Sequence, residues 1–66
     1  MTPADVKTAV KQIKERQGDY EAAHAMEDML YLEALKAIAS GNCDDPQAIA
    51  KEAIKTQRLG FARYCA

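Results

Sequence analysis

The chain has no tryptophan, only two cysteines and no long run of apolar residues. Cys43 and Cys65, without a CxxC motif, exclude a disulfide framework and a cysteine-rich zinc site. One bridge between them is conceivable only in an exported protein. There is also no apolar N-terminal segment and no stretch of about 18 apolar residues, which excludes a signal peptide and a membrane span. We therefore expect a cytoplasmic protein with two free thiols.

Charge of one sign is also lacking, because nine basic residues face ten acidic ones and the net charge is −1. That balance gives no general attraction to nucleic acid or anionic lipid. Lys7, Lys11 and Lys14 share one side of a predicted helix, but no helix-turn-helix or aromatic platform accompanies them. Nucleic-acid binding is therefore a weak alternative, and no membrane contact is expected.

The length of 66 residues leaves room for a single domain, 1–66, with a small core. A chain of this size buries only about 60% of its unfolded surface, and oligomerisation is a common remedy. A deep substrate cleft within one copy is not expected. We therefore predict a protein that is not an enzyme and has no cofactor.

Capping residues divide the chain into three helices. Thr2-Pro3 and Asp45-Pro46 are typical helix starts, and Asp19 is a typical N-cap. Gly18 is expected to end the first helix in a left-handed conformation, and Gly41 to end the second. The sequence thus predicts an all-α, compact three-helix domain with helices at about 3–16, 20–40 and 46–58. The aromatic tail, 61–66, is expected to pack back on the helices.

Apolar residues recur at helical spacing along all three segments. The buried faces are predicted to comprise Val6, Ala9, Val10 and Ile13; Tyr20, Ala23, Leu30, Tyr31, Ala34 and Ile38; and Ile49, Ala50, Ala53 and Ile54. The second helix also carries an apolar strip on its other side, formed by Ala22, Ala25, Met29 and Leu32. A helix that is apolar on two sides is either covered twice or shared with another copy. We expect that strip to be an interface, with a homodimer as one form of it.

An ionisable pair lies within the apolar face of the second helix. His24 and Glu27 fall among its buried positions, where a charge is costly unless it is paired. Glu27 is expected to pair with Arg63 of the tail or, as second choice, with Arg58. We predict a structural polar cluster comprising His24, Glu27, Asp28, Tyr31 and Arg63.

Two chemical alternatives use the same residues. Glu21-x-x-His24 matches the carboxylate–histidine step of helical di-iron sites, and Glu27 and Asp28 are further weak candidate ligands. Such a centre has to be doubled across a dimer. His24 and Asp28 form a second alternative, an acid–base pair, but no nucleophile with a helper accompanies them.

A resemblance runs along nearly the whole chain. The second helix carries a GDxExAHxxEDxLY pattern, formed by Gly18-Asp19, Glu21, Ala23-His24, Glu27-Asp28 and Leu30-Tyr31. The sequence ends in Phe61-Ala62-Arg63-Tyr64-Cys65-Ala66. The resemblance also includes Leu35, Ala37-Ile38-Ala39, Asp45-Pro46, Ala53 and Lys55-Thr56. These motifs resemble a family of short uncharacterised bacteriophage and bacterial proteins, in which a tryptophan often stands where this chain has Tyr64. The resemblance implies a phage or prophage origin and no established activity.

Together these features predict a small helical protein that acts by binding an unknown protein partner or its own copy. Metal binding through Glu21, His24, Glu27 and Asp28, or weak nucleic-acid binding, are the alternatives.

Overall fold

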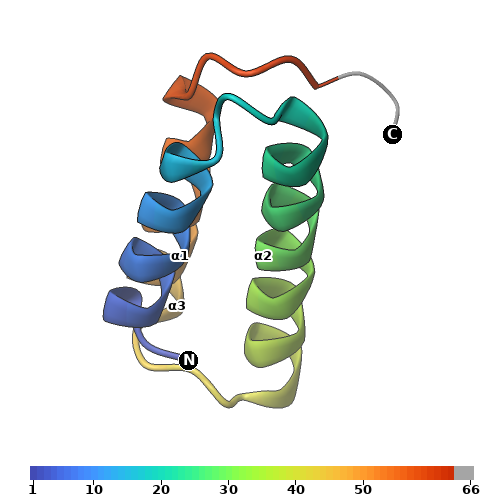
Figure 1. The fold of residues 1–66 in the computed structure, drawn as a ribbon. Helices are drawn as coiled ribbons and strands as arrows, with labels where there is room; N and C mark the ends of the chain where they lie inside the picture. Colours follow the sequence, from blue (N-terminus) through green and yellow to red (C-terminus); the bar gives the residue numbers. More distant parts are fainter. Residues whose placement is uncertain (64–66) are drawn as a thin grey trace.

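The computed structural model describes residues 1–63. These residues form α1 (Pro3–Glu15), α2 (Tyr20–Ser40) and α3 (Pro46–Ile54), followed by the short 3-10 helix η1 (Lys55–Arg58). The helices lie side by side, with α2 running opposite to α1 and α3 (Figure 1). The predicted all-α three-helix fold is confirmed. The third helix differs from the prediction only in that its last turn is a 3-10 helix.

Each α-helix begins where the cap residues predict. The side chains of Thr2, Asp19 and Asp45 each accept a hydrogen bond from the backbone N–H three residues ahead. Pro3 and Pro46 occupy the first turns, where a missing N–H costs nothing. Asp45 adopts a left-handed conformation, with φ of 52°, which turns the chain sharply into α3.

The two helix ends at glycines differ. Gly41 ends α2 in the left-handed conformation, with φ of 75°, as predicted. Gly18 is not left-handed, so that prediction is wrong. The reason is local: the N–H groups of Arg16 and Gln17 donate to carbonyls three residues back, which closes α1 without a left-handed residue.

The core is a narrow column of small and medium side chains. Phe61 is its only buried aromatic ring among residues 1–63, and it comes from the tail beyond η1. Phe61 packs against the helices, whereas Tyr64, the other aromatic residue of the tail that was predicted to pack back, lies outside the described residues. The buried apolar residues are Val6, Ile13, Ala23, Leu30, Ala34, Ile49, Ala53 and Phe61.

The core is narrower than the sequence predicts. Ala50 and Ile54 of α3, together with Tyr20 and Ile38 of α2, are exposed rather than buried. In α3, Ile49 and Ala53 fill the centre, and Ala50 and Ile54 lie one step further around the helix. None of the described segments covers that side, so the apolar face of α3 is wider than the contact it makes.

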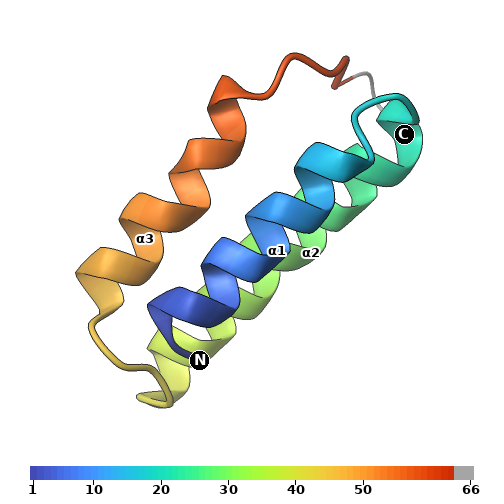
Figure 2. The same ribbon diagram turned by 60° about the vertical axis from the view of Figure 1, so that its left-hand side comes forward.

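Hydrogen bonds close both ends of the bundle, where Figure 2 shows the connecting segments. At the end near the N-terminus, the Met1 ammonium donates to the Asn42 carbonyl at 3.0 Å, and the Asp44 N–H donates to the Met1 carbonyl. At the opposite end, the Gly60 N–H donates to Oε1 of Gln17 at 3.2 Å. The second contact holds the start of the tail over the α1–α2 turn.

Candidate functional site

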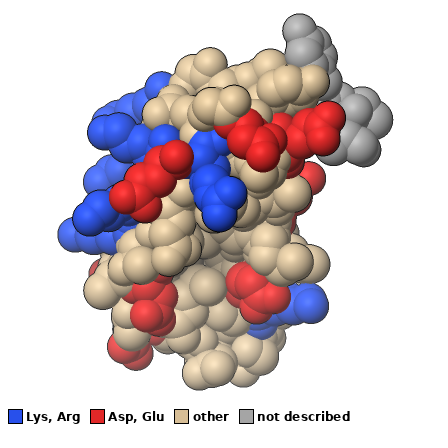
Figure 3. Space-filling view, viewed as in Figure 1, with Lys and Arg blue, Asp and Glu red and all other residues tan. Residues whose placement is uncertain are grey.

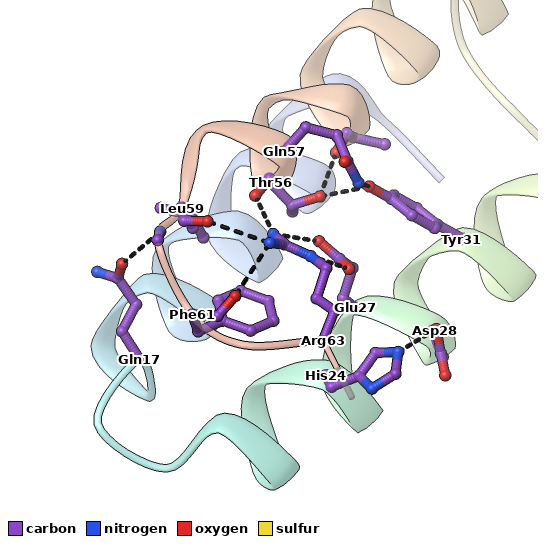
Figure 4. A network of polar contacts seen from close by, with 12 residues as sticks. Gln17, His24, Glu27, Asp28, Tyr31, Thr56, Gln57, Leu59, Phe61 and Arg63 are labelled. Carbon is purple, nitrogen blue, oxygen red and sulfur yellow. Dashed lines mark hydrogen bonds and ion pairs between the residues drawn. The ribbon is translucent and has the colours of Figure 1, made fainter. Parts of the chain in front are cut away.

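The polar cluster lies at the end of the bundle where the tail crosses α2 (Figure 4). Glu27 points inward from α2 and is only 3% exposed. Arg63 reaches it from the tail with two parallel hydrogen bonds, Nε to Oε1 at 2.9 Å and Nη2 to Oε2 at 3.0 Å. Arg63 was the first choice of partner for Glu27 in the sequence analysis, ahead of Arg58. Such a two-pronged contact is the geometry in which arginine binds carboxylates most strongly.

The Arg63 guanidinium also caps the backbone below it. It donates to the carbonyls of Thr56 at 2.7 Å and of Leu59 and Phe61 at 3.2 Å each. Its carbon lies 3.9 Å from the centre of the Phe61 ring. A guanidinium has five N–H donors, and these contacts use all five. Arg63 therefore joins α2, η1 and the tail, and has no donor left for a ligand.

The charges of this pair are held in place by their surroundings. Burial alone raises the pKa of Glu27, but hydrogen bonds from Arg63 and Thr56 and the charges of Arg63 and His24 outweigh it. The net result is a pKa of Glu27 below its ordinary value. The Glu27 carboxylate likewise raises the pKa of Arg63. Both groups therefore stay ionised near neutral pH.

A second set of contacts continues from the pair toward α3. The hydroxyls of Tyr31 and Thr56 are hydrogen-bonded to each other, and Gln57 donates to the Tyr31 hydroxyl at 2.9 Å. Thr56 is fully buried, and its hydroxyl also lies 3.1 Å from the Ala53 carbonyl. The sequence reasoning missed the roles of Thr56 and Gln57. The sequence signal for Thr56 was its position, since it is a polar residue one turn beyond Ala53, the last buried apolar residue of α3.

The remaining predicted members lie at the edge of this cluster. Nε2 of His24 is 3.6 Å from Oδ1 of Asp28, and the Asp28 side chain is exposed. His24 is half-buried beside the charged pair, and Glu21 is exposed one turn earlier. Within residues 1–63, no three His, Cys, Asp or Glu side chains are grouped so as to hold a metal ion. The candidate ligands Glu21, His24, Glu27 and Asp28 thus include one, Glu27, that Arg63 already binds.

The candidate thiol lies far from this cluster. Cys43 is a free, half-buried residue in the loop between α2 and α3, at the opposite end of the bundle from the cluster (Figure 1). It has no access to His24 as a base. Cys65, the other half of the conceivable bridge, lies outside the described residues.

An apolar groove lies between α2 and α3. Its volume is about 420 Å³ and its walls are almost entirely apolar. Leu35 of α2 is 65% exposed and Ile54 of α3 is 62% exposed, and both line the groove. Ile38 is 40% exposed and also lines the groove, as do Tyr31 and Gln57, which are hydrogen-bonded to each other. Ile38, Ala50 and Ile54, which were predicted to be buried and are exposed, all line the groove.

The apolar strip predicted as an interface lies on a different side of α2. Ala25, Met29 and Leu32 are exposed, Met29 by 57%, and Ala22 is half-buried. Met29 borders a smaller hollow of about 270 Å³ between α1 and α2. The structure thus offers two apolar surfaces on the two flanks of α2, and the larger one was not predicted.

Charge is divided between the helices. α2 has four acidic residues and one lysine, whereas α3 and η1 have three basic residues and one acidic residue. Figure 3 shows Lys and Arg gathered along the edge formed by α1 and α3, with acidic and uncharged side chains over most of α2. Among the described residues, no ion pair joins α2 to α3 or η1, because Glu27 of α2 pairs with Arg63 of the tail and Lys55 of η1 pairs with Glu52 of α3. Because Glu27 is bound by Arg63 and Glu33 lines the hollow beside α1, the exposed acidic residues of α2 that remain are Glu21 and Asp28.

The fold and its surfaces define a small three-helix domain with a closed polar cluster and an open apolar groove. Comparisons of the chain with protein-family models, with curated proteins and with solved structures found no match. The resemblance to short phage and bacterial proteins therefore stays a prediction. No helix in residues 1–63 is long and apolar enough to cross a membrane.

Proposed function

We propose that the protein is a protein-binding module whose contact surface is the groove between α2 and α3. The observation that carries this proposal is the exposure of Leu35, Ile38 and Ile54 in a chain with only eight buried apolar residues among those described. Contiguous exposed apolar side chains typically mark a contact surface. Burial of a large aliphatic side chain contributes about 1.5–3 kcal/mol, so three of them supply several kcal/mol of binding energy.

The residues around the groove indicate the chemistry of its partner. An apolar groove between two neighbouring helices fits a helical surface with its own apolar stripe. Lys51 and Arg58, which line a neighbouring hollow that shares Ile54, favour acidic side chains beside the groove on the α3 side. Asp28, one turn before Tyr31 on α2, favours a basic one. The expected partner is therefore an amphipathic helical surface with opposite charges along its two edges.

The polar cluster supports no second function of this kind. The donors of Arg63 all have acceptors within the chain, and Glu27 is bound on both oxygens. Such saturation favours a structural role. Metal binding across a dimer through Glu21, His24, Glu27 and Asp28, and weak nucleic-acid binding through Lys7, Lys11 and Lys14, stay alternatives. The phage or prophage origin and the cytoplasmic location are proposals that rest on the resemblance and on the sequence composition.

The proposal is tested with a designed peptide of the expected chemistry: an amphipathic helix with a leucine stripe, glutamates along one edge and lysines along the other. Titration into isotope-labelled protein should give saturable NMR shifts at Leu35, Ile38 and Ile54. Leu35→Glu should abolish them, because it places a charge in the apolar contact. Met29→Glu, an equally exposed position on the other flank of α2, is the matched control and should leave them unchanged. Shifts centred on Met29, or no saturable shifts, would overturn the proposal.

A further inference from the structure

We infer that the partner in the groove is a second copy of the chain, related to the first by a two-fold axis that runs along the groove. This inference rests on the proposed function, because it names the occupant of the same surface. It is argued from the charges on the two sides of the groove and from the levels of α2 and α3 along the bundle.

The charge division selects the direction of the axis. When two copies face each other across their α2–α3 surfaces, the two-fold axis lies in the contact plane. An axis across the groove sets α2 over α2 and α3 over α3, which opposes like charges. An axis along the groove sets α3 of each copy over α2 of the other. Only the second arrangement brings the basic helix onto the acidic one, and it does so twice.

The levels of the helices specify which residues then meet. Tyr31 is bonded to Thr56 and Gln57, which fixes the level of α2 against η1. Because α2 and α3 run in opposite directions, Arg58 lies within about one turn of the level of Asp28. One turn back along the chain, Ile54 lies near the level of Leu35. An axis along the groove preserves these levels, so Arg58 of one copy faces Asp28 of the other, and Ile54 faces Leu35.

These residues are available for such a contact. Leu35 and Ile54 are the two most exposed large apolar side chains among residues 1–63. Asp28 and Arg58 are also exposed, and Arg58 has no ion pair among the described residues. The arrangement therefore covers the apolar rim and pairs a free basic side chain with an acidic one at each edge. It also enlarges the core of a domain whose size makes oligomerisation a common remedy.

The experiment is sedimentation equilibrium of the whole chain from about 10 µM to 1 mM, the range in which weak dimers are measured. The wild type should approach twice its 7.3 kDa mass. Leu35→Glu should raise the dimer dissociation constant at least about 100-fold, because it buries charge at a contact made twice. Met29→Glu, on the other flank of α2, should change it less than about threefold. Circular dichroism of each variant checks that the fold is retained.

A charge exchange tests the direction of the axis. Arg58→Glu and Asp28→Arg should each weaken self-association about tenfold at low salt, because each opposes like charges twice. Mixed in equal amounts, the two variants should form a heterodimer of near wild-type strength, since both edges are then complementary. Lys11→Glu, a charge reversal on α1, is the matched control and should leave the dissociation constant unchanged.

The outcomes separate the inference from the proposed function. A wild type that stays monomeric at 1 mM, yet binds the amphipathic peptide in the groove, overturns the second copy and leaves the protein-binding module standing. A dimer that Met29→Glu breaks and Leu35→Glu does not overturns both. A dimer broken by Leu35→Glu whose charge variants do not recover on mixing overturns the axis along the groove.

Discussion

The polar cluster and the groove, two regions along α2, differ in how fully their side chains are covered. At the polar cluster, every donor of Arg63 meets an acceptor and Glu27 is almost fully covered. A few residues further along, the groove leaves Leu35 and Ile54 mostly exposed. The donors of the first region are all used within the chain, and the second region has apolar surface that residues 1–63 leave uncovered. This difference teaches that the conspicuous charged residues stabilise the fold, while the plain aliphatic ones are available for binding.

The largest expected effect comes from breaking the polar cluster. Arg63→Met should lower the free energy of unfolding by about 3–5 kcal/mol, because it leaves the Glu27 carboxylate buried without a partner. In a domain of this size, that is most of the total stability. Urea denaturation followed by circular dichroism measures it. Arg63→Lys, which cannot supply five donors, should recover only part of the loss. A loss below about 1 kcal/mol for Arg63→Met would contradict a structural role for the pair.

The next effect is on the hydroxyl contacts that extend the cluster. Thr56→Val keeps the shape of a fully buried side chain but removes the partner of the Tyr31 hydroxyl. The expected loss is about 1–2 kcal/mol of unfolding free energy. Thr8→Val is a suitable control, because Thr8 makes a similar bond to a carbonyl on the exposed face of α1. Equal losses for both variants would show that the buried contacts carry no special weight.

Acid should weaken the polar cluster in a defined pH window. The pKa of Glu27 is lower in the folded chain than in the unfolded one, because bonds and charges from Arg63 outweigh the effect of burial. Its contribution is therefore fully present above the unfolded pKa, about 4.3, and is lost as the pH falls through the folded pKa. Urea midpoints at intervals from pH 6 to pH 2 should fall less steeply for Glu27→Gln than for the wild type. If the two proteins lose stability equally with falling pH, the Glu27–Arg63 pair does not contribute to the pH dependence of stability.

The smallest expected effect on stability is at the groove. Leu35→Asn and Ile54→Asn change side chains that are mostly exposed in a single chain, so each should alter the unfolding free energy by no more than about 0.5 kcal/mol under dilute conditions. The same substitutions should weaken association strongly. Urea denaturation at low and high protein concentration separates the two effects, because only the wild type should gain stability with concentration. A large loss at low concentration would place these residues in the core instead.

Local signals allowed much of the fold to be predicted from the sequence. Thr2, Asp19, Asp45 and Gly41 act within one turn of the chain, so their roles can be read from neighbouring residues. Gly18 failed as a left-handed stop because a 3-10 turn satisfied the same backbone groups. The pairing of Glu27 with Arg63 could be anticipated because a buried carboxylate requires a base.

The groove could not be predicted in the same way. Ile49, Ala50, Ala53 and Ile54 all lie on one apolar face of α3, and helical periodicity does not say which of them meets another helix. That depends on how α3 sits against α1 and α2, which is set by packing among residues distant in sequence. The sequence therefore indicated the exposed apolar strip near Met29 but not the groove between α2 and α3.

The central claim is that the groove is the surface through which the chain binds, with a second copy as its occupant. The most direct measurement is a dilution series of the methyl NMR spectrum of the wild-type protein, which needs no substitution. The account predicts that the methyl signals of Leu35, Ile38 and Ile54 shift together with protein concentration, while those of Met29 and of the core residue Val6 do not. Groove signals that stay fixed while Met29 moves, or a spectrum unchanged across the series, would contradict it.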